Sequence, residues 1–126
     1  MMATPTILLV EDDETLRRFY RANLALAGYD VREAGDGLEA LRWIDSEPPD
    51  LVLLDLGLPF ISGDTVRQEI AAHAHTRNIP IVIVTGSTAP LEGLDVACVL
   101  RKPVATDRLL EVIRTCLASG ARAAGS

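Results

Sequence analysis

The sequence has few residues of several kinds, and each scarcity counts against a class of protein. Lys102 is the single lysine among 12 basic residues, and 18 acidic residues leave a net charge of −6. Proteins that bind nucleic acid need a basic surface, so this acidic chain is a poor candidate for direct nucleic-acid binding. The longest apolar runs span five or six residues. A membrane-spanning helix needs about 20, so no membrane insertion is expected.

Cysteine is also scarce, and the start of the chain lacks an export signal. Cys98 and Cys116 lie in apolar periodic segments, as buried core cysteines often do, and make only a weak case for a disulfide. The opening Met-Met-Ala-Thr-Pro-Thr has neither the basic start nor the long apolar stretch of a secretion signal. These features predict a reducing, cytoplasmic setting.

The apolar pattern predicts one α/β domain with a doubly wound parallel sheet. Strand-like runs at 6–10, 30–34, 50–55, 79–84 and 97–100 alternate with helical patterns at 14–27, 37–46, 63–75 and 106–118. This alternation is typical of βαβ units, and continuous apolar strands imply burial on both faces. The run at 30–34 alternates and carries charge, which predicts an edge strand.

The remaining segments set the limits of the domain. Asp13 can cap the first helix, and Thr106 can cap the last. The stretch 87–96 has room for little more than one or two helical turns. Residues 121–126 are mostly small, which predicts coil. We therefore expect a domain over 1–120 and a flexible tail over 121–126.

Several polar side chains follow the predicted strands at the sheet edge where ligands bind in this fold class. Glu11 and Asp12 follow the first strand, Asp55 ends the third, Thr85 follows the fourth and Lys102 follows the fifth. Converging carboxylates repel one another unless a cation is present, and an oxygen-only set suits Mg²⁺ or Mn²⁺. A metal, a hydroxyl and an ammonium beside a carboxylate suit phosphoryl transfer, with the carboxylate as a potential acceptor.

Four segments in order carry a resemblance to a known family. They are Ile-Leu-Leu-Val-Glu-Asp-Asp at 7–13, Leu-Val-Leu-Leu-Asp-Leu-Gly-Leu-Pro at 51–59 with Gly63, Ile-Val-Ile-Val-Thr-Gly at 81–86, and Leu-Arg-Lys-Pro at 100–103. The chain resembles the receiver domain of bacterial two-component response regulators over about residues 5 to 118. The resemblance implies a flavodoxin-like fold with five parallel strands in the order 2-1-3-4-5.

The resemblance also implies a metal site. Asp12 would bind Mg²⁺ directly, Glu11 would act through water, and Asp55 would supply a further carboxylate. The backbone carbonyl of Gly57 would complete the protein ligands, with Mn²⁺ as an alternative metal.

The same resemblance implies the phosphoryl chemistry. Asp55 would accept the phosphoryl group from a phosphohistidine, Thr85 would hydrogen-bond it and Lys102 would pair with it. The Lys102–Pro103 peptide bond would be cis. The domain would be a signalling module and not an enzyme, although it would catalyse its own phosphorylation and dephosphorylation.

The partners implied are a sensor histidine kinase or a histidine phosphotransfer protein, with a homodimer as a further option. Few residues follow the last helix, so we expect a stand-alone receiver that acts through protein contacts or relays phosphate. A receiver excised from a hybrid kinase would have the same sequence features.

Two features depart from the family pattern. Val99 stands where the family usually has an aromatic residue, three positions before the lysine. The stretch from Thr85 to Lys102 is shorter than usual, which predicts a truncated or missing fourth helix. A subgroup of single-domain receivers has such a collapsed helix. Neither departure changes the residues that the resemblance assigns to phosphorylation.

Three other interpretations fit parts of the sequence. Residues 35–40 fit a dinucleotide-binding fingerprint, but their strand reads as an edge strand and Asp36 would face the pyrophosphate. Aspartate-nucleophile phosphatases usually carry a second aspartate two positions after the first, where this chain has Gly57. A pseudo-receiver would share the fold and lack the phosphorylation. His73 and His75 lie two positions apart, so we do not expect them to share a helix face or to bind metal.

Overall fold

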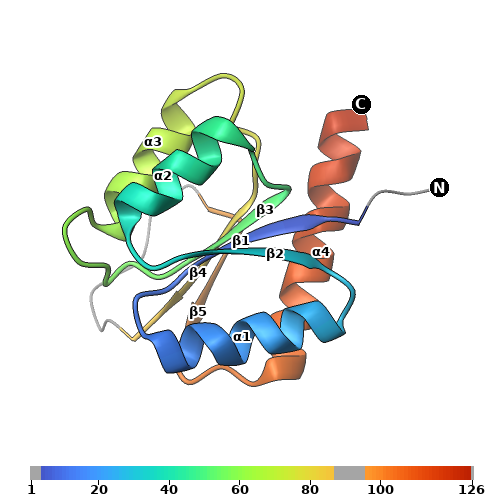
Figure 1. The fold of residues 1–126 in the computed structure, drawn as a ribbon. Helices are drawn as coiled ribbons and strands as arrows, with labels where there is room; N and C mark the ends of the chain where they lie inside the picture. Colours follow the sequence, from blue (N-terminus) through green and yellow to red (C-terminus); the bar gives the residue numbers. More distant parts are fainter. Residues whose placement is uncertain (1–3, 87–95, 126) are drawn as a thin grey trace.

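The computed structural model describes residues 4–86 and 96–125 (Figure 1). The strands are β1 Thr6–Val10, β2 Asp30–Ala34, β3 Leu51–Leu54, β4 Ile81–Thr85 and β5 Cys98–Arg101. The helices in this part of the chain are α1 Glu14–Leu26, α2 Gly37–Ser46, α3 Gly63–Ala72 and α4 Thr106–Gly125.

All strand pairs are parallel, and the order β2-β1-β3-β4-β5 confirms the predicted topology. Helices α1 and α4 cover one face of the sheet, and α2 and α3 cover the other (Figure 1). Each face has its own apolar cluster. Leu9, Leu53 and Val84 lie in the α1/α4 cluster, whereas Leu8 and Leu54 lie in the α2/α3 cluster. Alternate residues of the same strands thus serve opposite layers.

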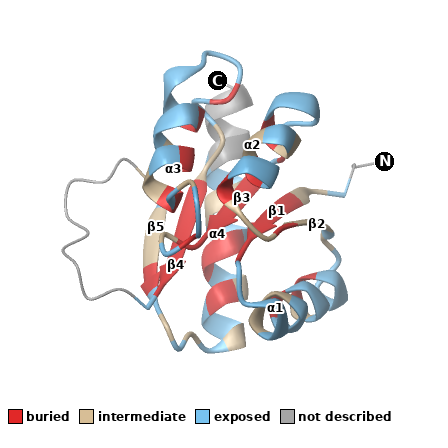
Figure 2. Ribbon diagram, turned by 60° about the vertical axis from the view of Figure 1, so that its left-hand side comes forward, coloured by how far each residue is buried: buried red, intermediate tan, exposed pale blue. Residues whose placement is uncertain are grey.

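Burial follows the predicted strand positions. The central strands β1, β3 and β4 are almost entirely buried, as the red segments in Figure 2 show. Strand β2 is largely half-buried and lies at the sheet edge, which confirms the interpretation of its charged sequence. Because β2 is not central, the segment 35–40 lacks the position of a dinucleotide fingerprint.

Side-chain caps fix where three helices begin. Asp13 accepts a hydrogen bond from the Leu16 N–H at 3.0 Å, as predicted for α1. Asp36 caps α2 and Ser62 caps α3 in the same way. These caps satisfy N–H groups that the first helical turn leaves unpaired.

The C-terminal helix differs from its predicted bounds. Helix α4 extends to Gly125, through most of the segment predicted as coil, instead of ending near residue 118. Alanine and arginine have high helix propensities, and a helix that has already formed extends more easily than a new one nucleates. The prediction of coil was therefore wrong as far as Gly125.

The predicted truncation or loss of a helix between β4 and β5 concerns residues 87–95, which lie outside the described residues. Val99, at the position where the family usually has an aromatic ring, is half-buried in β5 and packs against the α2/α3 cluster. Among the described helices, none combines the length and the apolar character needed to cross a membrane.

Candidate metal centre

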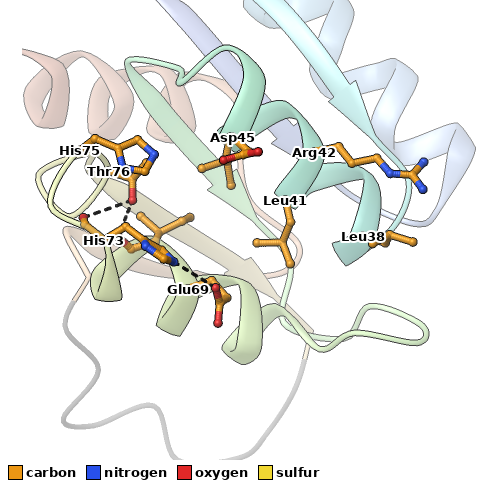
Figure 3. Close-up of a pocket in the computed structure, with 10 residues that line it drawn as sticks. Leu38, Leu41, Arg42, Asp45, Glu69, His73, His75 and Thr76 are labelled. Carbon is orange, nitrogen blue, oxygen red and sulfur yellow. Dashed lines mark hydrogen bonds and ion pairs between the residues drawn. The ribbon is translucent and has the colours of Figure 1, made fainter.

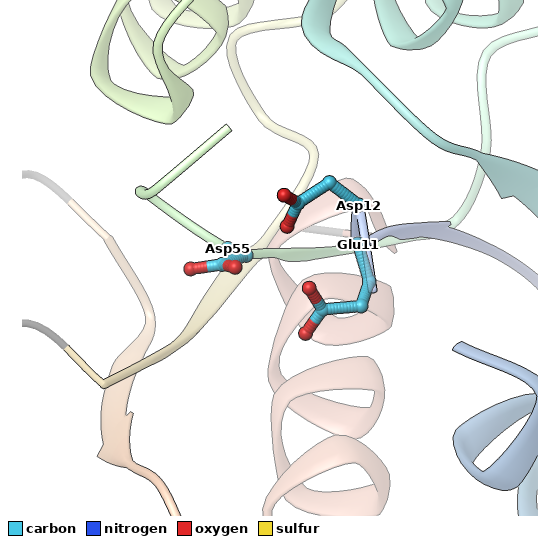
Figure 4. A group of neighbouring side chains, drawn as sticks. All are labelled: Glu11, Asp12 and Asp55. Carbon is cyan, nitrogen blue, oxygen red and sulfur yellow. The ribbon is translucent and has the colours of Figure 1, made fainter. Parts of the chain in front are cut away.

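Three carboxylates meet just beyond the ends of β1 and β3 (Figure 4). One ligand oxygen from each of Glu11, Asp12 and Asp55 lies within 4.8 Å of the other two. Glu11 is only 2% exposed and Asp55 only 7%, whereas Asp12 is open to solvent. The cluster therefore has two buried walls and one accessible side, as an entering cation requires.

Parallel pairing explains why residues far apart in sequence converge here. Val10 of β1 is in register with Leu54 of β3, so Glu11 and Asp55 are adjacent continuations of neighbouring strands. The Asp55 N–H donates to the Val10 carbonyl at 3.0 Å, which extends the ladder by one step. The predicted convergence of Glu11, Asp12 and Asp55 is thus a consequence of strand order.

Lys102 joins the acidic cluster from the end of β5. Its Nζ lies 2.6 Å from Glu11 Oε1 and 3.2 Å from Asp55 Oδ2. Its backbone N–H donates to the Thr85 carbonyl at 2.9 Å, and its peptide bond to Pro103 is cis, as predicted. The single lysine of the chain therefore contacts both buried carboxylates.

The surroundings of Glu11 and Lys102 favour protonation at the cluster. Burial raises the pKa of Glu11 from 4.5 to about 7, opposed by the hydrogen bond from Lys102 and reinforced by the charge of Asp55. Burial alone would lower the pKa of Lys102, but its contacts with Glu11 and Asp55 outweigh burial and raise that pKa. Carboxylates outnumber the ammonium, so the cluster favours an added proton or cation.

The loop after β3 holds the carboxylate of Asp55 in place. The Gly57 N–H donates to Asp55 Oδ1 at 3.1 Å, so both carboxylate oxygens are hydrogen-bonded. Gly63 packs tightly behind this loop. A Cβ at Gly63 would lie 2.3 Å from the Asp55 carbonyl oxygen, which only glycine avoids. The Gly63 N–H also donates to the Leu56 carbonyl at 3.2 Å.

Thr85 is the buried last residue of β4. It pairs in register with Arg101 of β5, and Leu54 of β3 pairs with Ile83. This register brings Thr85 to the same sheet edge as Asp55 and Lys102. All predicted site residues therefore lie at one edge.

Two residues of α1 beside the site were not predicted as part of it. The Arg17 Nη1 donates to the Glu11 carbonyl at 2.9 Å, and buried Tyr20 packs on the face that also carries Leu24. The spacing of residues 17, 20 and 24 indicates a shared helical face, but it cannot show that the face reaches the end of β1. Phe19, which neighbours Tyr20 on α1, is half exposed.

A cavity lies between α2 and α3, away from the acidic cluster (Figure 3). It has a volume of about 330 Å³ and is lined by Leu41, Asp45, Glu69 and His73, among others. His73 and His75 do approach each other, with ring centroids 5.9 Å apart, because the chain leaves the helix after Ala72. Since α3 begins beside the acidic cluster, its last turn lies toward the opposite sheet edge.

The fold and the acidic edge define a class of signalling domain, and comparison with known proteins agrees. The family model of the response regulator receiver domain matches residues 7–114. The chain therefore belongs to the response regulator receiver domain family of two-component signalling. Receiver domains are signalling domains and not classical enzymes.

Three relatives illustrate the likeness. The chain is 33% identical over 118 residues to the DNA-binding dual master transcriptional regulator RpaA of Synechocystis, covering 90% of this chain and 49% of RpaA. It thus spans about half of RpaA. It is 29% identical over 119 residues to the polar-differentiation response regulator DivK of Brucella ovis, covering 90% of this chain and 97% of DivK.

The third relative is a solved structure. It is the receiver domain of the sensor histidine kinase PA1611 from Pseudomonas aeruginosa, with a magnesium ion coordinated in its active site cleft. The match has a TM-score of 0.84 and 28% identity, and it covers 92% of this chain and 99% of that domain.

Proposed function

We propose that this receiver domain accepts a phosphoryl group on Asp55 from a phosphohistidine and uses the change to switch protein contacts or to relay phosphate. The observation that carries the proposal is the position of Lys102. Its ammonium reaches both Asp55 and Glu11, inside a cluster of carboxylates that can hold a dication. A phosphoryl acceptor needs this combination of a nucleophilic oxygen and opposing positive charge.

The donor set fits Mg²⁺, with Mn²⁺ as an alternative. Glu11, Asp12 and Asp55 offer only oxygen ligands within 4.8 Å of one another, which suits hard divalent cations. Asp12 and Asp55 would hold the ion directly, Glu11 through water, and the Gly57 carbonyl would complete the protein ligands. When bound, the ion would neutralise charge on the transferring phosphoryl oxygens.

The protein side chains would share the remaining work. An Asp55 oxygen forms the new P–O bond as the P–N bond to the donor imidazole breaks, and the electron pair returns to that nitrogen. Lys102 would leave the carboxylate and pair with the phosphoryl oxygens, and the Thr85 hydroxyl would donate a hydrogen bond to them. Attack of water on phosphorus would later regenerate the carboxylate, so the domain would catalyse only its own modification.

The partners follow from the donor chemistry. A sensor histidine kinase or a histidine phosphotransfer protein would supply the phosphohistidine, in the cytoplasm, without direct nucleic-acid contact or membrane insertion. The chain is similar both to the response regulator DivK and to the receiver domain of the sensor histidine kinase PA1611, so both a stand-alone regulator and a receiver of a hybrid kinase fit the proposal. A homodimer remains a further option.

Intact-mass measurement tests the proposal. Incubation with phosphoramidate and Mg²⁺ should add one phosphoryl group to the wild-type protein and none to Asp55→Asn. The matched control is Asp45→Asn, which removes one exposed carboxylate from α2 and should be modified like the wild type. Chelation of the metal with EDTA should suppress the modification.

Two outcomes would overturn the proposal. Equal modification of wild type and Asp55→Asn would remove Asp55 as the acceptor. A folded wild-type protein that binds Mg²⁺ and gains no mass would instead be a pseudo-receiver. The phosphatase alternative gains no support, because Gly57 supplies no side chain where those enzymes usually have a second aspartate.

A further inference from the structure

Arg17 connects the acidic loop to the edge strand of the sheet. Its Nη1 donates to the carbonyl oxygen of Glu11 at 2.9 Å, and its Nε lies 3.5 Å from Oε1 of Glu33 on β2. The Arg17 side chain is only 21% exposed. One guanidinium therefore holds the backbone of Glu11 and a carboxylate of the neighbouring strand at the same time.

The space around this guanidinium is restricted. A Cβ at Gly35, in the turn after β2, would lie 3.3 Å from the Arg17 Nη1, so the head group lies directly against that turn. Glu33 is itself held, because its Oε2 also pairs with the Nε of Arg21 at 3.1 Å. The Arg17 guanidinium that donates to the Glu11 carbonyl is thus held in place by Glu33 and by the turn after β2.

We infer that Arg17 is a positioning residue for the metal centre. By fixing the Glu11 carbonyl, it holds the turn from which the Glu11 and Asp12 carboxylates project toward Asp55. The inference rests on the proposed metal site. A planar guanidinium can bridge a carbonyl and a carboxylate in fixed directions, which a flexible ammonium does less well. Partners that orient metal ligands commonly affect metal affinity strongly.

A positioning role and a purely electrostatic role of Arg17 predict opposite changes in Mg²⁺ affinity when the side chain is removed. Removing a cation near an acidic site strengthens attraction for Mg²⁺, so a purely electrostatic role predicts tighter binding in Arg17→Ala. A positioning role predicts weaker binding. Arg21→Ala is the matched control, because it removes the same charge from the same helix and from the same Glu33 but does not contact Glu11.

Calorimetric titration of the metal-free proteins with Mg²⁺ tests the inference. We expect the Kd of Arg17→Ala to rise about tenfold, the low end for ligand-orienting partners, and that of Arg21→Ala to change less than about twofold. Arg17→Lys keeps the charge but lacks the planar guanidinium that reaches both the Glu11 carbonyl and Glu33, so its Kd should fall between those of the wild type and Arg17→Ala. Circular dichroism establishes that each variant is folded. If Arg17→Ala does not fold, the comparison of the Mg²⁺ Kd of Arg17→Lys with that of the wild type tests the positioning role.

The outcomes separate this inference from the proposed function. Mg²⁺ binding by wild type and unchanged or tighter binding by the Arg17 variants would overturn the positioning role alone. No Mg²⁺ binding by the wild-type protein would overturn the proposed metal site itself, and the role of Arg17 with it.

Discussion

Glu11 and Lys102 set the charge balance of the acidic edge. Glu11 is buried and hydrogen-bonded to Lys102, yet its pKa is raised to about 7, because burial and the charge of Asp55 outweigh the ammonium. The folded protein therefore holds a proton on Glu11 over a pH range in which an unfolded chain would have lost it. The site is a place where negative charge costs free energy unless a cation joins it.

This shift predicts an unusual pH dependence of stability. The unfolded glutamate titrates near 4.5 and the folded one near 7, so the metal-free protein should lose stability as pH rises between these values. The shift corresponds to about 3 kcal/mol at most. Urea unfolding in EDTA at a series of pH values should show this fall for wild type. Glu11→Gln should flatten it.

The same group should couple Mg²⁺ binding to pH. Because the metal competes with the Glu11 proton, affinity should rise as pH increases through about 7 and then level off. Both predictions depend on the raised pKa of Glu11. If urea unfolding in EDTA gives the same pH profile for wild type and Glu11→Gln, that raised pKa is contradicted.

At the scale of elements, two loops carry the site and helices hold them. The loop after β1 leads into α1, whose Arg17 bonds back to Glu11. The loop after β3 leads into α3, whose first residue, Gly63, packs on the backbone of Asp55 and Leu56. Helix α2 also packs closely against this loop, because a Cβ at Gly37 would lie only 2.6 Å from the Ile61 carbonyl oxygen. Helix starts thus support both acidic loops.

Gly63→Ala should therefore disturb fold and site together. The added methyl would overlap the Asp55 carbonyl, and such overpacking typically costs about 1–3 kcal/mol. We expect a lower urea midpoint and weaker Mg²⁺ binding. The control is Gly86→Ala, where a Cβ meets nothing within 4 Å and the backbone requires no positive φ. Equal stability of the two variants would contradict the tight packing of Gly63.

At the scale of the whole molecule, the sequence predicted the layers of the fold and the site residues. It did not predict the contacts that helices make with the loops of the site, or the full length of the last helix. Five apolar runs between helical patterns predicted a parallel sheet, and polar residues at the strand ends predicted a site. The strand order that brings Glu11, Asp55 and Lys102 together came from the family resemblance and is confirmed by the structure. Arg17 was missed because its partner is a backbone carbonyl, which no side-chain pattern reports. The extension of α4 was missed because small residues were read as coil.

Phe60 illustrates the same limit. It lies in the loop after β3, is 95% exposed and has a φ of 66°, a left-handed conformation that is rare for an aromatic residue. The sequence around it resembles the family segment, but backbone geometry of this kind depends on the packing of the whole loop between β3 and α3.

The central claim is that Asp55 carries the phosphoryl group, and borohydride trapping tests it most directly. Borohydride reduces an acyl phosphate to an alcohol, so the modified aspartate becomes homoserine and is located by peptide mass spectrometry. After treatment with phosphoramidate and Mg²⁺, we expect homoserine at position 55 and unmodified aspartate at position 12. Homoserine at another aspartate, or a phosphoryl group found on His73 or His75 with Asp55 unmodified, would contradict the claim.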